Sequence, residues 1–63
     1  MIPRKTIENL VNTNVYLYVK NVTKEFGGLL KAISDSDVVT LADKNNNLIH
    51  IPLSEIIVVT ERQ

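Results

Sequence analysis

Turn-forming residues divide this chain into short apolar segments of similar length, and this division constrains the fold more than any other feature. Clusters of Asn, Asp, Ser and Thr include residues 12–14, 34–37 and 43–47, and a less regular polar segment occupies residues 21–25. These residue types favour turns. The segments between them are rich in Val, Ile and Leu and are short, so they predict β-strands.

Five strands are predicted, at about residues 15–20, 26–33, 38–42, 48–51 and 56–60. The first of them shows a period of two most clearly. Its apolar residues Val15, Leu17 and Val19 alternate with Tyr16, Tyr18 and Lys20. Such alternation is typical of a strand with one buried face.

Two local features complete the predicted architecture. Ile7, Leu10 and Val11 recur at helical spacing, which predicts a short helix over about residues 3–11. Gly27-Gly28, near the start of the second predicted strand, is typical of a bulge, a sharp bend or a close approach between backbones. We therefore expect one mainly β domain over residues 1–63: a short N-terminal helix, then a five-stranded, strongly bent antiparallel SH3-like small barrel.

The composition limits both stability and function class. With 63 residues the chain is close to the lower size limit for a single core, and it has no cysteine for a disulfide or a thiolate metal site. Seven Lys and Arg balance seven Asp and Glu, which argues against a non-specific nucleic-acid coat protein but allows a local basic face. No apolar run approaches the ~18 residues of a membrane helix or resembles a signal peptide, so the default expectation is a cytoplasmic protein.

The last predicted strand carries Ile-Ile-Val-Val at residues 56–59 and is therefore apolar on both faces. In a monomer one of these faces would be exposed, and the strand edge would invite pairing with another chain. Small domains without disulfides or metals often gain burial by oligomerising. We predict an oligomer; the alternative is that this strand is central in a closed monomeric barrel.

The order of these elements resembles the Sm-like family, which includes the Sm, LSm and Hfq proteins. The aromatic-x-Gly-x-Leu motif of the family's bent second strand reads Phe-Gly-Gly-Leu-Leu at residues 26–30. The run Ile-Pro-Leu-Ser-Glu-Ile-Ile at residues 51–57 is similar in spacing to the Hfq-type ending. The resemblance covers the chain from Ile7 to about Val59.

This resemblance implies a ring of about six or seven copies, in which the fourth strand of one subunit pairs with the fifth strand of the next. It also implies an RNA-binding or RNA-chaperone-type protein. The residues expected at the subunit interface are Leu48, Ile49, Ile51, Ile56, Ile57 and Val58. Other copies of the chain and RNA are the expected partners, and no cofactor, small-molecule substrate or membrane partner is expected.

The nucleotide pocket that the resemblance implies is divergent here. Its Asp position falls on Ser34, with Asp35 one residue later, its aromatic or Met position on Asp37, and its Asn position on Val38. An Asp offers no flat apolar surface for a base, and a Val cannot read a base edge. The Arg of the second motif falls on Pro52, so we predict that the usual uridine pocket is absent.

The candidate RNA contacts are Ser34, Asp35, Ser36, Asp37, His50, Ser54, Tyr16, Tyr18 and Lys20. The Tyr-x-Tyr-x-Lys stripe at residues 16–20 could stack bases and contact phosphate, although tyrosine is also a good strand former. His50 could stack on a base or be an ordinary exposed strand residue. Arg4 and Lys5 would add positive charge to the helix-bearing face of a ring.

Other chemistries find less support in the sequence. Asp35, Asp37 and Asp43 could bind a hard cation, but they lack calcium-loop spacing, and turn aspartates usually cap backbone groups. We find no nucleophile with a nearby base and no glycine-rich phosphate loop, so an enzyme is not expected. The predicted function is a ring-forming, Sm-like RNA-binding protein with a divergent site. The alternatives are a ring scaffold that binds protein but not RNA, and a monomeric SH3-like protein-binding module.

Overall fold

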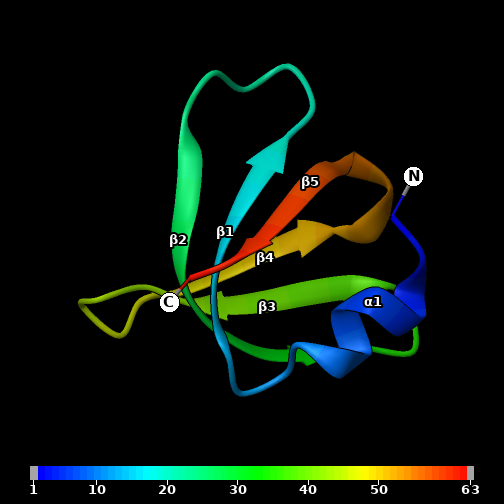
Figure 1. The fold of residues 1–63 in the computed structure, drawn as a ribbon, viewed down its shortest axis with the longest axis horizontal. Coiled ribbons are helices and arrows are strands. Elements are labelled where there is room, and N and C mark those ends of the chain that lie inside the picture. Colours follow the sequence, from blue (N-terminus) through cyan, green and yellow to red (C-terminus); the bar gives the residue numbers. More distant parts are fainter. Residues whose placement is uncertain (1, 63) are drawn as a thin grey trace.

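The computed structural model describes residues 2–62 and consists of a short helix and an antiparallel sheet (Figure 1). Its elements are α1 (Arg4–Asn9), β1 (Asn14–Val19), β2 (Glu25–Ile33), β3 (Val38–Ala42), β4 (Leu48–Pro52), the 3-10 helix η1 (Leu53–Glu55) and β5 (Ile56–Glu61). All five predicted strands are present with nearly the predicted ends. No helix within residues 2–62 has the length and apolar character needed to cross a membrane.

The helix α1 is shorter than the predicted span of residues 3–11. It begins after Pro3, whose extended backbone (φ −62°, ψ 141°) leads into the first turn. It ends where Leu10 leaves helical geometry, with φ −101° and ψ 2°. Asn12 then adopts a left-handed conformation (φ 72°) and donates its backbone N–H to the carbonyl of Leu30 at 2.7 Å. This bond to β2 takes the place of another helical turn.

The sheet has the strand order β4-β3-β2-β1-β5. The long strand β2 belongs to both halves, because its first part pairs with β1 and its second part, from Leu29, pairs with β3. Figure 1 shows β2 curving between the two halves, and the register between β2 and β3 shifts between Leu30 and Ala32. The prediction of a small five-stranded antiparallel β fold is confirmed, but the sheet does not close into a barrel, because β4 and β5 lie at its two ends.

The glycine pair in β2 is required for close backbone approach. Neither glycine has a positive φ, and the register shift lies beyond them. Gly28 pairs with the buried Val15 and therefore faces the interior. A Cβ at Gly28 would lie 2.2 Å from the carbonyl oxygen of Ala42, at the end of β3. Only glycine leaves room for the two strands to converge here.

The core lies on the concave side of the bent sheet and is closed at one end by α1. It is made of residues that the strand alternation turns inward, together with Ile7 from the helix and Leu53 from η1. Its buried members are Ile7, Val15, Leu17, Leu30, Val39, Leu41, Ile51, Leu53 and Ile56. The alternation predicted for β1 is confirmed, because Val15 and Leu17 are fully buried and Tyr18 is exposed.

Candidate nucleic-acid interface

The turn between β2 and β3, where the resemblance places the nucleotide pocket, is held mainly by its own hydrogen bonds. The hydroxyl of Ser34 accepts the backbone N–H of Val38 at 3.1 Å, and the N–H of Asp37 donates to the carbonyl of Ser34 at 3.0 Å. Asp37 is left-handed (φ 62°), a conformation that Asp and Asn tolerate better than most residues. The side chains of Asp35 and Ser36 are exposed at the tip of the turn. Ser34 and Asp37 therefore shape this turn.

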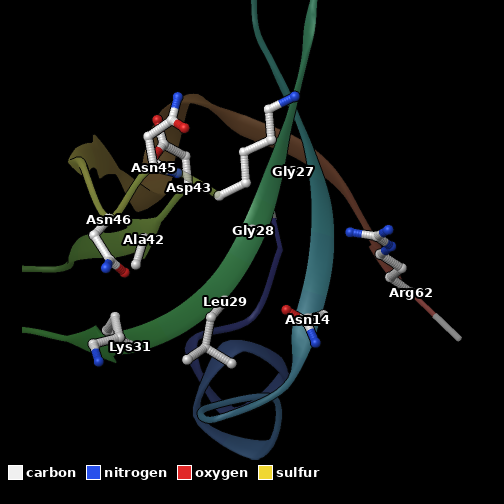
Figure 2. Close-up of a pocket in the computed structure, with 11 residues that line it drawn as sticks. Asn14, Gly27, Gly28, Leu29, Lys31, Ala42, Asp43, Asn45, Asn46 and Arg62 are labelled. Carbon is white, nitrogen blue, oxygen red and sulfur yellow. Dashed lines mark hydrogen bonds between the residues drawn. The ribbon is translucent and has the colours of Figure 1, made fainter.

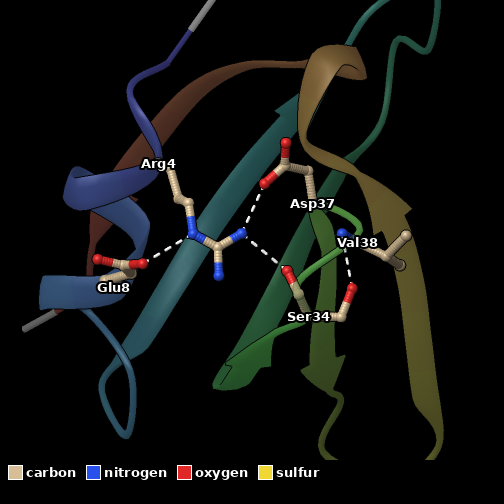
Figure 3. Close-up of polar contacts among 5 residues, drawn as sticks. All are labelled: Arg4, Glu8, Ser34, Asp37 and Val38. Atoms are coloured by element: carbon tan, nitrogen blue, oxygen red, sulfur yellow. Dashed lines mark hydrogen bonds and ion pairs between the residues drawn. The ribbon is translucent and has the colours of Figure 1, made fainter.

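Arg4 ties the helix α1 to this turn (Figure 3). Its guanidinium donates to a carboxylate oxygen of Glu8 at 2.8 Å, to the carbonyl of Ser34 at 2.7 Å, and to the carboxylate of Asp37. Hydrogen bonds to Asp37 and Glu8 raise the pKa of Arg4 above its ordinary value, so it stays charged. Of the two residues predicted to form a basic face, Arg4 is therefore paired with two carboxylates, and Lys5 is exposed.

The structure brings Ser54 to the same end of the fold as this turn. The backbone N–H of Leu53 in η1 donates to the carbonyl of Asp37 at 2.8 Å, and Val38 pairs with Pro52 across β3 and β4. Ser54 itself is exposed. These two segments are therefore neighbours, as the resemblance implies, but neither contributes an aromatic side chain on which a base could stack.

His50 lies elsewhere, on the outward face of β4. It is exposed between the half-buried Ile49 and the buried Ile51, as the alternation predicts. Its Nδ1 lies 3.1 Å from the hydroxyl of Thr40, its cross-strand partner on β3. This contact fixes the ring on the strand and leaves its outer side open to solvent.

The tyrosine stripe lies on the outer face of β1, and both rings already have partners. Tyr16 packs against Gly27, and the guanidinium of Arg62 lies 5.8 Å from the centroid of its ring, a cation–π distance. Tyr18 donates its hydroxyl to Glu25 at 2.7 Å, and this hydrogen bond raises the pKa of Tyr18. Lys20 is exposed at the end of the stripe. Base stacking on Tyr16 would require the guanidinium to move or to become part of the stack.

The six residues predicted for the subunit interface fall into two groups. The side chains of Ile51 and Ile56 lie in the core of the chain itself, and Ile49 packs against that core. The alternation of β4 turns Ile49 and Ile51 inward. Ile56 is turned inward by its pairing with Val19 of β1, which the doubly apolar sequence of β5 did not reveal. Leu48, Ile57 and Val58 are 56%, 57% and 46% exposed, respectively, on the two edge strands.

A groove of about 500 Å³ opens beside the glycine pair of β2 (Figure 2). Its lining residues are Asn14, Gly27, Gly28, Leu29, Lys31, Ala42, Asp43, Lys44, Asn45, Asn46 and Arg62. Figure 2 shows β2 crossing the groove, with the β3–β4 turn on one side and Arg62 on the other. The sequence identified the glycines and the asparagine turn separately, but nothing in it indicated that Lys31 and Arg62 would meet them.

Asp43 organises the turn that borders this groove. One of its carboxylate oxygens accepts the backbone N–H groups of Asn45 and Asn47, at 2.8 and 2.9 Å. The hydrogen bond from the Asn47 backbone is the largest of several that lower the pKa of Asp43. Asn46, with φ 63°, completes the turn. Within residues 2–62 no group of three or more His, Cys, Asp or Glu side chains is arranged to hold a metal ion.

Comparisons with known proteins found no relative that identifies the chain. No protein-family model matches it, and neither a curated protein nor a solved structure matches its sequence or fold. The functional argument therefore depends on the residues and geometry of this chain.

Proposed function

We propose that this chain is the subunit of a homo-oligomeric ring of Sm-like type that binds RNA at a divergent site. The observation that carries the proposal is the open sheet. β4 and β5 are each hydrogen-bonded to one neighbouring strand only, and such edge strands pair readily with other chains. A ring would pair β4 of one copy with β5 of the next and leave no free edge.

The exposed apolar side chains support the same assembly. Leu48 lies on β4, and Ile57 and Val58 lie on β5, so the most exposed of the large apolar residues in the sheet lie on the two strands that would meet. A contact between two different edges is heterologous, and repeated with a suitable rotation it closes into a ring. The element order α1, five strands and a 3-10 turn before β5 also agrees with the resemblance found in the sequence.

A second candidate function, a ring scaffold that binds protein but not RNA, has support from the turn between β2 and β3. Its Asp37 is bound by Arg4, its tip carries Asp35 and Ser36, and it presents no stacking surface. A ring that had lost RNA binding and served as a protein scaffold would need no stacking surface in this turn. A monomeric SH3-like module remains the third hypothesis, and it leaves both sheet edges open.

Light scattering combined with RNA titration separates these functions. The same sample would be titrated with oligo-U, oligo-A and a structured RNA at low and moderate salt. If the chain forms an RNA-binding ring, we expect a hexamer or heptamer whose affinity for at least one of these RNAs falls as salt rises. A ring that binds none of the three RNAs would favour the scaffold, and a monomer would contradict the ring.

A matched pair of variants tests whether the edges make the ring. Ile57→Asp places a charge on β5, where the partner's β4 would pack, and is expected to reduce the assembly to smaller species. Val22→Asp changes an apolar residue of similar exposure, 42% against 57%, that lies in the loop between β1 and β2. This control is expected to keep the wild-type mass, and equal masses for both variants would contradict the edge-to-edge contact.

A further inference from the structure

The groove beside Gly27 and Gly28 has a positive charge that the whole chain lacks. Three cationic side chains, Lys31, Lys44 and Arg62, line it against the single carboxylate of Asp43, whereas the chain as a whole carries no net charge. The Asp43 carboxylate is directed to the backbone N–H groups of its own turn. The ion pairs found within residues 2–62 all involve Arg4, so none of the three groove cations lies within ion-pair distance of a carboxylate there.

Arg62 is positioned for an anion by its neighbours. Its backbone N–H donates to the carbonyl of Asn14 at 2.8 Å, which continues the β1–β5 pairing. Its guanidinium is held over the ring of Tyr16. Contact with an aromatic face leaves the N–H donors at the edge of the guanidinium available, and their planar fork matches the oxygens of a phosphate. Tyr16 is therefore a positioning residue for Arg62.

The backbone of β2 at Gly27 is open on the groove side. Pairing with β3 begins only at Leu29, so at Gly27 the side of β2 away from β1 has no strand beside it. On the β1 side, the backbone carbonyl of Leu30 accepts the N–H of Asn12, and the N–H of Leu30 donates to the carbonyl of Thr13. Backbone groups alternate between the two sides of a strand, so those of Gly27 point toward the open side.

We propose that this groove binds the phosphate groups of single-stranded RNA, with Lys31, Lys44 and Arg62 as their counter-charges. The volume of about 500 Å³ lies within the ~300–1,000 Å³ typical of ligand sites and accommodates a short stretch of sugar-phosphate backbone. This inference rests on the proposed function, because it assigns the RNA backbone to one surface. It places that contact away from the β2–β3 turn, whose carboxylates disfavour phosphate.

The test measures binding of pentauridylate to the full chain as a function of salt, together with amide chemical shifts. The variants Lys31→Gln, Lys44→Gln and Arg62→Gln remove one groove charge each, and Lys24→Gln removes an exposed charge outside the groove as the control. Each groove variant is expected to weaken binding about fivefold. Each is also expected to reduce the slope of log K against log salt by about 0.7, the contribution of one phosphate contact with a single strand.

Amide shifts separate the failure of this inference from the failure of the proposed function. Pentauridylate is expected to move the amides of Gly27, Gly28 and Asn45, and Lys24→Gln is expected to bind as the wild type does. RNA binding that leaves these amides and the groove variants unaffected would overturn the groove and leave the proposed function standing. Inorganic tripolyphosphate serves as the second probe. Groove shifts with tripolyphosphate but not with pentauridylate would assign the site to free phosphate and overturn the RNA contact. No response to either probe would overturn the groove as a phosphate site, whereas the proposed function fails only if oligo-A and the structured RNA also do not bind.

Discussion

Replacement of Gly28 by alanine tests the convergence of β2 and β3 at a single atom. A Cβ there would lie 2.2 Å from the carbonyl oxygen and 2.9 Å from the carbonyl carbon of Ala42, and 3.2 Å from the Cα of Asp43. All three atoms belong to the backbone, so no side-chain rotation relieves the contact. Nonbonded heavy atoms favour separations of ~3.5–4.0 Å. The end of β3 would have to move by roughly 1 Å, which disturbs the pairing of Leu29 with Ala42.

The expected destabilisation follows from two opposing terms. Overpacking that forces backbone shifts costs about 1–3 kcal/mol, and more where the backbone cannot yield. Alanine in place of glycine returns about 0.5–1 kcal/mol by restricting the unfolded chain. We therefore expect Gly28→Ala to lower the free energy of unfolding by about 1–2 kcal/mol or more. In a domain of this size that corresponds to a fall in Tm of about 5–15 °C.

Gly27→Ala is the matched control, because it makes the same chemical change one residue earlier. Its Cβ would lie 2.9 Å and 3.0 Å from the Cε1 and Cδ1 atoms of Tyr16. Tyr16 is half-buried on the outer face and its ring can rotate, so we expect a Tm within a few degrees of the wild type. Both variants would be followed by thermal and urea unfolding at one protein concentration, because assembly makes Tm depend on concentration. Equal loss of stability in the two variants would refute the explanation that a Cβ at Gly28 clashes with the backbone of Ala42.

Three further predictions concern the core, the helix and the β3–β4 turn. At a protein concentration low enough for the chain to be monomeric, Ile56→Ala is expected to cost about 2–5 kcal/mol in urea unfolding. Ile57→Ala, at a position exposed in the single chain, is expected to cost far less there; the reverse order would show that β5 faces the other way. Arg4→Gln is expected to lower Tm by a few degrees at low salt and by less at high salt. Lys5→Gln is the control and is expected to leave Tm unchanged. Equal Tm values for the two variants would contradict a stabilising role for the contacts of Arg4 with Glu8 and the β2–β3 turn. The lowered pKa of Asp43 means that its contribution to stability is complete above its ordinary pKa and is lost as pH falls through the lower folded value. Asp43→Asn should therefore lose less Tm than the wild type between pH 7 and pH 2, and equal losses would argue against that contribution.

The positions of the strands and turns were predictable from the sequence because they depend on local chemistry. Within residues 2–62, the residues with left-handed backbone are Asn12, Asn21, Asp37 and Asn46. All are Asn or Asp and lie in or at the edge of the polar segments that the sequence marked as turns. The alternation of Val15 and Leu17 with the tyrosines likewise identified the buried face of β1. Each of these features is encoded within a few neighbouring residues.

The assignment of individual side chains to the interface was less predictable. Ile56 and Ile57 are identical in type, yet Ile56 is fully buried and Ile57 is 57% exposed. A run of four apolar residues carries no alternation, so its sequence does not show which face is turned inward. The pairing of β5 with β1, which includes a register shift between Tyr18 and Val19, decides that question.

The sequence by itself thus determined five short strands, the chemistry of the turns between them and the glycine pair in β2. Only the tertiary structure decided that Arg4 reaches Asp37, that Gly28 meets Ala42, and that Lys31, Lys44 and Arg62 line one groove. The physical reason is the separation of these residues along the chain. Turn chemistry and strand period act between neighbours, whereas contacts across tens of residues depend on the register and curvature of the whole sheet.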